Sequence, residues 1–365
     1  MNRKPVFWIA PFVLIGLVGL DIPTTAAQTA TPSTAKAPAK PATSSKTTVA
    51  KAPAKKPAPK PVYSAARSRS RKATLGRARA TANAREVATT VLPRYKVDAS
   101  GDLVPDLRAA AAIILNPVTG EVLWEENSQS QRSIASITKV MTAVVFFEGT
   151  PDPTQQVTIV RSDVYQASTT KLRAGDRVTV DDLLHLLLIP SDNAAARALA
   201  RISPQGSDGF IARMNSKALE MGLVSTRYAD PSGLLSDNVS SAYDMARLIA
   251  HASADDRISS IMRTSEYTVH AAKRTFSFHS TNQLLGKEEY DVRAAKTGFI
   301  TKSGYCLATL LQLPQGGAQV AVVVLGARSN AGRFLETQNL FSWLSNKASS
   351  IFATQTPVVV AAPQE

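Results

Sequence analysis

An apolar segment with helical periodicity, residues 133–147, constrains the fold of this chain more than any other feature. Ile137, Val140, Met141 and Val144 recur at spacings of three and four residues, and almost no charged residue lies between them. This spacing predicts a helix. Because nearly all of its surface is apolar, other elements must cover it on most sides. The segment therefore predicts a helix buried near the middle of a folded domain.

The start of this helix carries a hydroxyl and an amine, on Ser136 and Lys139. Residues three apart lie on the same helical face, so the amine can reach the hydroxyl. The unpaired backbone N–H groups of a first helical turn also favour a developing negative charge. Together these groups indicate a nucleophile beside a base. The pattern Ser-x-x-Lys also occurs at 33–36 and 168–171, and a lone copy more often means an N-cap serine beside a surface lysine.

Two further polar motifs lie downstream. Ser191-Asp192-Asn193 stands between a helix stop at Pro190 and a helix start, in a loop that can aim polar side chains. Lys296-Thr297-Gly298 ends a strand-like segment, where the lysine and threonine could bind a carboxylate and the glycine lets a ligand backbone approach. Ser-x-Asn recurs at 236–238 and 280–282. Each motif alone is therefore also consistent with ordinary turn residues.

The net charge of +14 is concentrated at the front of the chain. Of the 42 Lys/Arg and 28 Asp/Glu residues, positions 28–90 hold 14 and one, and positions 1–27 hold two and one. Positions 91–365 thus hold 26 of each and are neutral. The basic charge describes a leading segment and not the folded body, which argues against a nucleic-acid-binding protein.

The composition predicts four segments. Residues 1–27 have a positive start, an apolar run and small residues at the end, which predicts a signal peptide and a periplasmic or otherwise extracytoplasmic location. Residues 28–94 are rich in Ala, Pro, Lys and Arg, which predicts a disordered tether that is also able to contact an anionic wall or membrane surface. A folded domain is predicted over 95–350 and a disordered tail over 351–365.

Cysteine and histidine usage predicts neither a disulfide nor a metal site. Cys306 is the single cysteine, and its apolar neighbours indicate a buried strand. The four histidines lack the paired spacing of metal ligands. We therefore expect no cofactor.

The folded domain is predicted to be α+β. Strand-like segments lie at both of its ends and helical patterns lie between and after them. The expected strands are 109–115, 121–125, 157–160, 291–297, 305–312 and 318–327, and the expected helices, besides the central one, are 183–188, 194–200, 206–221, 241–252 and 330–346. The terminal strands would join in one antiparallel sheet beside a helical lobe.

The three motifs in this order resemble those of the penicillin-binding, serine-active D-Ala-D-Ala peptidases. The resemblance covers roughly 105–346 and extends to 134–143 and 229–234. It is greatest to the short carboxypeptidase/endopeptidase group that includes penicillin-binding protein 7. It implies a β-lactamase/transpeptidase-like fold with the active site between the sheet and the helical lobe.

The resemblance also implies catalytic roles. Ser136 would attack a D-alanyl peptide carbonyl and form an acyl-enzyme, and Lys139 would accept its proton. Ser191 would relay a proton to the leaving amine, and Asn193 would hold Lys139 and the substrate amide. A free lysine has a pKa of about 10.4, so burial and the nearby charge of Lys296 would have to lower the pKa of Lys139.

The same resemblance implies a substrate-binding set. Lys296 and Thr297 would bind the terminal carboxylate of the substrate, with Gly298 allowing its close approach. The backbone N–H groups of Ser136 and Phe299 would form the oxyanion hole. Arg333 occupies the place of an arginine that binds the carboxylate in some relatives.

The implied function is a peptidoglycan hydrolase of cell-wall biogenesis and cell shape, with stem peptides as substrates and β-lactam antibiotics as covalent inhibitors. The folded body is expected to end near residues 343–351, without the β-rich domain of longer carboxypeptidases. This favours a DD-endopeptidase acting on cross-links over a D-alanyl-D-alanine carboxypeptidase.

Two other functions are less well supported. A β-lactamase of class A needs a glutamate for deacylation, whereas the corresponding loop 228–238 offers only Asp230 and Asp237. An inactive wall-binding protein would have no need of Ser136, Lys139 and the two later motifs together.

Overall fold

The computed structural model describes residues 93–354 except 273 and 315–316, together with Thr81, Ala84 and Ala88, and only the backbone of 348–354. The predicted signal peptide (1–27) lies outside the described residues, as does the predicted tether (28–94) apart from its last two residues and these three single positions. Within the described part, no helix combines the length and the apolarity that crossing a membrane requires.

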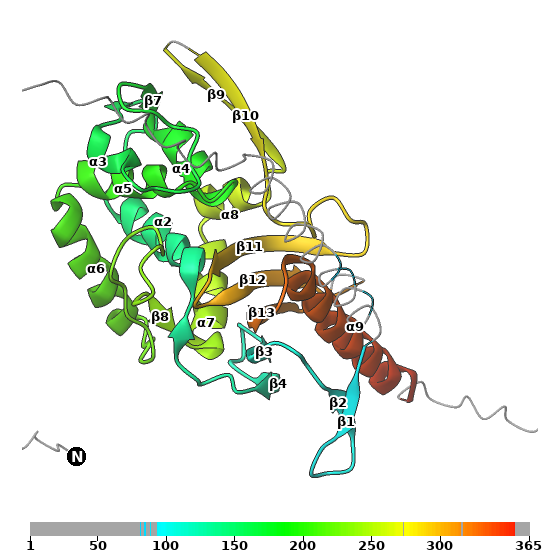
Figure 1. The fold of residues 1–365 in the computed structure, drawn as a ribbon. Coiled ribbons are helices and arrows are strands. Elements are labelled where there is room, and N and C mark those ends of the chain that lie inside the picture. The colour runs from blue at the N-terminus through cyan, green and yellow to red at the C-terminus, as the bar shows by residue number, and fades with distance from the viewer. Residues whose placement is uncertain are drawn as a thin grey trace, which may run out of the picture. The chain divides into compact units, whose positions relative to one another are not determined.

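A five-stranded antiparallel sheet forms the centre of the domain (Figure 1). Its strand order is β11-β12-β13-β3-β4. The strands are β3 (Ala111–Leu115), β4 (Val122–Glu126), β11 (Asp291–Ile300), β12 (Gly304–Gln312) and β13 (Gln319–Ala327). Because β13 pairs with β3, the last strands of the domain lie beside the first. This confirms the predicted α+β fold with a sheet built from both ends of the domain.

Each face of the sheet has its own apolar core. On β3, Ile113 packs into the core shared with the helical lobe, whereas Ile114 packs into a second core under the last helix. The alternation follows from the two-residue period of a strand. The last helix, α9 (Asn330–Thr354), covers the second face.

The predicted central helix is present as a 3-10 turn, η1 (Ala135–Ile137), followed by α2 (Thr138–Glu148). All residues of α2 from Thr138 to Phe147 are buried, as the apolar pattern predicts. The helices around it are α3 (Arg161–Val164), α4 (Val180–Leu188), α5 (Asn193–Ile202), α6 (Gly206–Glu220), α7 (Ala242–Ser253) and α8 (Asp256–Met262).

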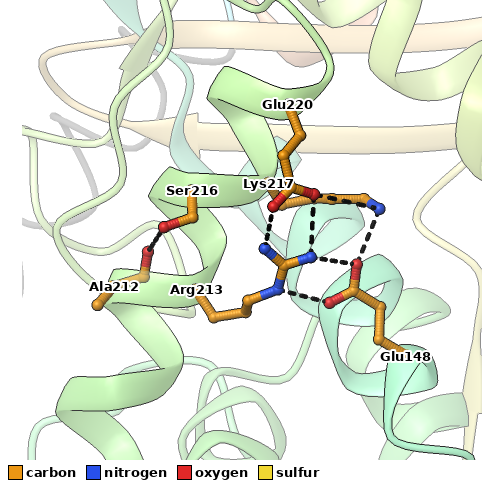
Figure 2. Close-up of polar contacts among 6 residues, drawn as sticks. All are labelled: Glu148, Ala212, Arg213, Ser216, Lys217 and Glu220. Atoms are coloured by element: carbon orange, nitrogen blue, oxygen red, sulfur yellow. Dashed lines mark hydrogen bonds and ion pairs between the residues drawn. The ribbon is translucent and has the colours of Figure 1, made fainter.

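An ion-pair network joins the end of α2 to α6 (Figure 2). Glu148 accepts from Arg213 Nε and from Lys217 Nζ, both at 2.8 Å, and Arg213 also pairs with Glu220. These side chains are partly exposed, so each pair contributes at most about 1 kcal/mol to stability. Burial of the apolar side chains of α2 is therefore expected to stabilise the packing of the two helices more than these ion pairs do.

Four short antiparallel pairs complete the fold. They are β1 (Tyr95–Val97) with β2 (Leu103–Pro105), β5 (Arg132–Ser133) with β8 (Val239–Ser240), β6 (Gln156–Thr158) with β7 (Arg177–Thr179), and β9 (Glu266–Ala271) with β10 (Arg274–His279). The β9–β10 hairpin projects from the domain (Figure 1). The sequence analysis did not predict it, because its strands are rich in polar and charged residues.

The last helix corrects one predicted boundary. Residues 351–354 were predicted to belong to a disordered tail, but α9 continues through Thr354. Between Asn346 and Thr354 the sequence contains neither glycine nor proline, so nothing in the chain ends the helix earlier.

Candidate active site

The three sequence motifs meet where η1, the loop before α5 and strand β11 come together. Lys139 Nζ lies 2.9 Å from Ser136 Oγ and 2.6 Å from Asn193 Oδ1. A Cβ added to Gly298 would lie 2.6 Å from the carbonyl oxygen of Ile134 and 3.2 Å from the N atom of Ser136. Strand β11 therefore passes directly against the turn that carries Ser136, and only a glycine fits there.

The described second copy of Ser-x-x-Lys, at 168–171, does not form such a pair. Lys171 Nζ donates to the carbonyl oxygen of Ser277 on the β9–β10 hairpin (2.7 Å), and the copy at 33–36 lies outside the described residues. The tripeptide 236–238 is structural, since Asn238 Oδ1 accepts from the N–H of Ala229 (3.1 Å). The contacts of Lys171 thus differ from those of Lys139, which lies on the buried helix that the sequence predicts.

Lys139 is fully buried and surrounded by oxygen acceptors. Besides Ser136 and Asn193, its Nζ donates to the carbonyl oxygen of Ser232 (2.6 Å). Burial lowers the pKa of Lys139 to about 7, and the nearby charges of Asp192 and Asp230 oppose this only in part. The predicted effect of burial is thus supported. Arg197 also lowers the pKa of Lys139, and the expected repulsion between Lys139 and Lys296 acts to lower the pKa of Lys296.

The loop of Ser191 is held in a strained conformation. Ser191 has a φ of 65°, in the left-handed region that non-glycine residues rarely adopt. The N–H of Asp192 donates to Leu186 (2.8 Å) and its carboxylate caps α5 by accepting from Ala194 and Ala195 (2.8 and 3.0 Å). These bonds on both sides keep the strained residue in place. Ser191 Oγ is buried and has no hydrogen-bond partner among the described residues.

The amide of Asn193 is oriented by its partners. Its Nδ2 donates to the carbonyl oxygen of Ala167 (2.7 Å) and to Ser168 Oγ (3.2 Å). Its Oδ1 is thereby turned toward Lys139 Nζ. An amide held from both ends fixes the position of the lysine amine, as the sequence analysis expected of Asn193.

A loop that the sequence analysis left without a role supports the start of α2. Asp230 accepts from the N–H groups of Ser232 (2.6 Å), Gly233 (2.7 Å) and Leu235 (2.6 Å). Burial would raise the pKa of Asp230, but these bonds outweigh it and leave the pKa below its usual value. The carboxylate is therefore occupied in holding the loop, and the loop presents the Ser232 carbonyl to Lys139. The sequence pointed to this loop only through the resemblance of residues 229–234 to the D-Ala-D-Ala peptidases.

Lys296 and Thr297 are buried beside this group. Lys296 Nζ donates to the carbonyl oxygen of Thr297 (3.0 Å). Burial, then the charges of Lys139 and Arg333, lower the pKa of Lys296 well below its usual value. A carboxylate bound here would supply the opposite charge and restore the ammonium form. Thr297 Oγ1 lies 2.6 Å from Thr281 Oγ1, a contact that the sequence analysis did not foresee.

The last two predicted site residues differ in exposure, since Phe299 is exposed and Arg333 is buried. Phe299 is 48% exposed and stacks on Tyr305. Arg333, only 6% exposed, donates from Nη1 to the carbonyl oxygens of Gly298 and Cys306, both at 3.1 Å. Its guanidinium therefore braces strands β11 and β12 from α9. The Nη1 donors of Arg333 are thus engaged by backbone carbonyls, and its expected contact with a substrate carboxylate stays a prediction. Cys306 is buried, as predicted.

One open groove lies away from the three motifs. It has a volume of about 660 Å³ and lies between α7, α8, the β3–β4 turn and the ends of β11–β13 remote from Gly298. None of the residues that line it belongs to the site formed by Ser136, Lys139 and the two later motifs.

Comparison with known proteins agrees with this arrangement. Residues 98–329 match the family described as D-alanyl-D-alanine carboxypeptidase, Peptidase S11. The D-alanyl-D-alanine endopeptidase of Pseudomonas aeruginosa is 32% identical over 262 residues, 71% of this chain and 84% of that protein. The corresponding endopeptidase of Haemophilus influenzae is 34% identical over 63% of this chain and 80% of its own length. The crystal structure of the Streptomyces K15 DD-transpeptidase superposes with a TM-score of 0.61 at 28% identity, covering 66% of this chain and 97% of that one.

Proposed function

Because this chain belongs to the D-alanyl-D-alanine carboxypeptidase family of serine peptidases, we propose that it cuts D-alanyl amide bonds of peptidoglycan through an acyl-enzyme on Ser136. The observation that carries the proposal is the 2.9 Å contact between Ser136 Oγ and a fully buried Lys139 whose pKa is about 7. A lysine with that pKa is partly neutral at physiological pH and can accept a proton.

The first half of the reaction follows from these positions. Neutral Lys139 takes the proton of Ser136 Oγ as the oxygen attacks the carbonyl carbon. Asn193 Oδ1 and the Ser232 carbonyl hold the resulting ammonium. The backbone N–H groups of Ser136 and Phe299 receive the negative charge on the carbonyl oxygen. This role of Phe299 is supported by the close approach of β11 to η1 at Gly298.

Collapse of the tetrahedral intermediate breaks the carbon–nitrogen bond. The leaving amine takes a proton, and Ser191 is the proposed relay between it and Lys139. Its buried hydroxyl has no hydrogen-bond partner among the described residues, which leaves it free to donate and accept during the reaction. Water then hydrolyses the ester on Ser136 by the reverse sequence of proton transfers.

Lys296 and Thr297 are proposed to bind the carboxylate on the leaving side of the bond. Both are nearly inaccessible to bulk water, which strengthens a charge interaction with a bound anion. β-Lactam antibiotics carry a carboxylate at a similar distance from a strained amide. They are therefore expected to acylate the same serine.

The proposed substrate is the cross-link between stem peptides, cut by DD-endopeptidase action. The named activity of the relatives from Pseudomonas aeruginosa and Haemophilus influenzae supports this choice. The family description favours the second candidate, carboxypeptidase action on a terminal D-Ala. Both substrates present a D-alanyl amide with a carboxylate beyond it, so the residues of the site serve either one.

Digestion of defined muropeptides separates the two activities. The protein is incubated with a cross-linked dimer and, in parallel, with a monomeric pentapeptide, and the products are identified by mass spectrometry. We expect the dimer to be cut faster, and Ser136→Ala to abolish both reactions. Release of D-Ala from the pentapeptide with the dimer left intact would contradict the endopeptidase assignment and leave the acyl-enzyme mechanism standing.

The predicted export remains part of the proposal. A peptidoglycan substrate requires a location outside the cytoplasm, and residues 1–27 have the composition of a signal peptide. Fractionation of cells that express the full chain should recover the protein from the periplasmic or extracytoplasmic fraction.

A further inference from the structure

Thr281 contacts both sides of the proposed active site. Its backbone N–H donates to the carbonyl oxygen of Ile189 (3.2 Å), two residues before Ser191. Its side-chain Oγ1 lies 2.6 Å from Oγ1 of Thr297 on β11. One residue thus joins the loop of the second motif to the strand of the third, although it belongs to neither.

The backbone around Thr281 is held in place by its neighbours. The N–H of Ser280 donates to Ser265 (2.7 Å), Ser280 Oγ accepts from the N–H of Asn282 (3.1 Å), and Asn282 Oδ1 accepts from the N–H of Leu284 (3.1 Å). A turn closed by these local side-chain bonds has little freedom. The hydroxyl of Thr281 is therefore presented to Thr297 in a fixed position.

Either of the two hydroxyls can donate in the contact between Thr281 and Thr297. A threonine hydroxyl has one hydrogen and can accept two hydrogen bonds. Thr281 Oγ1 also lies 3.4 Å from the carbonyl oxygen of Ile189, which offers it a second acceptor. Once a carboxylate takes the hydrogen of Thr297, only Thr281 can donate along the short bond. When Thr281 donates along the short bond, Thr297 accepts and keeps its own hydrogen for a third partner. Accepting a bond also polarises a hydroxyl and makes it a better donor.

We propose that Thr281 is a positioning residue that turns the Thr297 hydroxyl into a dedicated donor for the carboxylate of the substrate. The inference rests on the proposed function, in which Thr297 binds that carboxylate. Thr281 does not touch the reacting atoms. Its effect is therefore confined to substrates and inhibitors that carry the anion.

The test compares two inhibitors of the same skeleton, one with a free carboxylate and one in which a methyl ester removes the negative charge. Acylation of Ser136 by benzylpenicillin and by its methyl ester is measured as k2/K for the wild type and for Thr281→Val, which keeps the shape and removes the hydroxyl. We expect the acid-to-ester ratio of k2/K to fall about tenfold in Thr281→Val, the size expected when one hydrogen bond to a charged group is weakened. The loss should lie in K, with k2 nearly unchanged.

Two further variants serve as controls. Thr281→Ser restores the hydroxyl and should restore the ratio to within about threefold. Thr268→Val removes a similar hydroxyl pair, Thr268 Oγ1 with Ser277 Oγ at 2.7 Å on the β9–β10 hairpin, and should leave the ratio unchanged.

The outcomes separate the inference from the proposed function. An equal loss for acid and ester, an unchanged ratio in Thr281→Val, or no rescue by serine would each overturn the positioning role. A wild-type protein that penicillin does not acylate at Ser136 would overturn the proposed function, and the inference with it.

Discussion

Lys139 shows how one buried side chain acquires the chemistry of a base. An ammonium group in the interior loses its hydration, which disfavours the charge, whereas oxygen acceptors and nearby carboxylates favour it. Here burial is the larger effect, and the pKa of Lys139 falls from 10.5 to about 7. The acceptors on Ser136, Asn193 and Ser232 leave the amine in one position in either protonation state.

The pH dependence of acylation follows from that pKa. Only neutral Lys139 can accept the proton of Ser136, so k2/K for benzylpenicillin should rise about tenfold per pH unit below pH 7 and level off above it. Stopped-flow or gel-based labelling between pH 5 and 8 measures this profile. Lys171→Ala, which alters the other described Ser-x-x-Lys copy, should keep the same profile. A rate independent of pH across this range would show that Lys139 is not the base.

At the scale of elements, the close contact between β11 and η1 assembles the site. Gly298 lies against Ile134 and Ser136 with no room for a side chain. On the other side, a Cβ on Gly233 would lie 2.0 Å from the carbonyl oxygen of Ala135. The turn that carries the nucleophile is thus enclosed by the backbones of two elements distant in sequence, and its geometry depends on both.

Replacing Gly298 with alanine should damage the site more than the fold. The new Cβ would push β11 away from η1 because its nearest neighbour is a backbone carbonyl that cannot rotate aside. Displacements of this kind cost about 100-fold in rate, so we expect acylation of Ser136 to fall by about that factor in penicillin labelling. Gly149→Ala is the matched control, since its nearest neighbour is 3.6 Å away. Wild-type labelling rates in Gly298→Ala would contradict the importance of this contact.

At the scale of the whole molecule, the net positive charge and the catalytic residues lie in different parts of the chain. Positions 28–90 hold 14 basic residues and one acidic residue, whereas positions 91–365 are neutral. The catalytic motifs all lie in the neutral part. The basic segment is therefore expected to act on location and not on chemistry.

Deletion of 28–90 tests this separation. The shortened protein should hydrolyse a small soluble substrate at the wild-type rate and bind anionic vesicles or isolated cell wall more weakly, most clearly at low salt. A full-length variant with the 14 basic residues replaced by glutamine distinguishes charge from length and should behave as the deletion does. A large fall in activity on the soluble substrate would show that the segment contributes to the folded site.

Much of the fold and part of the site could be predicted because the responsible interactions are local. The capping box of Thr179 and Asp182 starts α4 just before the predicted helical segment 183–188, and a cap of this kind depends on residues three apart. The apolar spacing of α2, and the alternation of β3 and β13 side chains between the two cores, follow in the same way from the helix and strand periods. The order of the three motifs indicated the family before any contact was known.

The sequence by itself determined the central helix, the strands that form the sheet, the reactive groups and their order along the chain. Only the tertiary structure decided that the Ser232 carbonyl and Thr281 belong to the site, and that Arg333 braces strands β11 and β12 from α9. The physical reason is that these contacts join residues 16 to 93 positions apart, often through backbone atoms that every residue carries. Such contacts leave no local pattern, and the burial that lowers the pKa of Lys139 arises only when all of them form together.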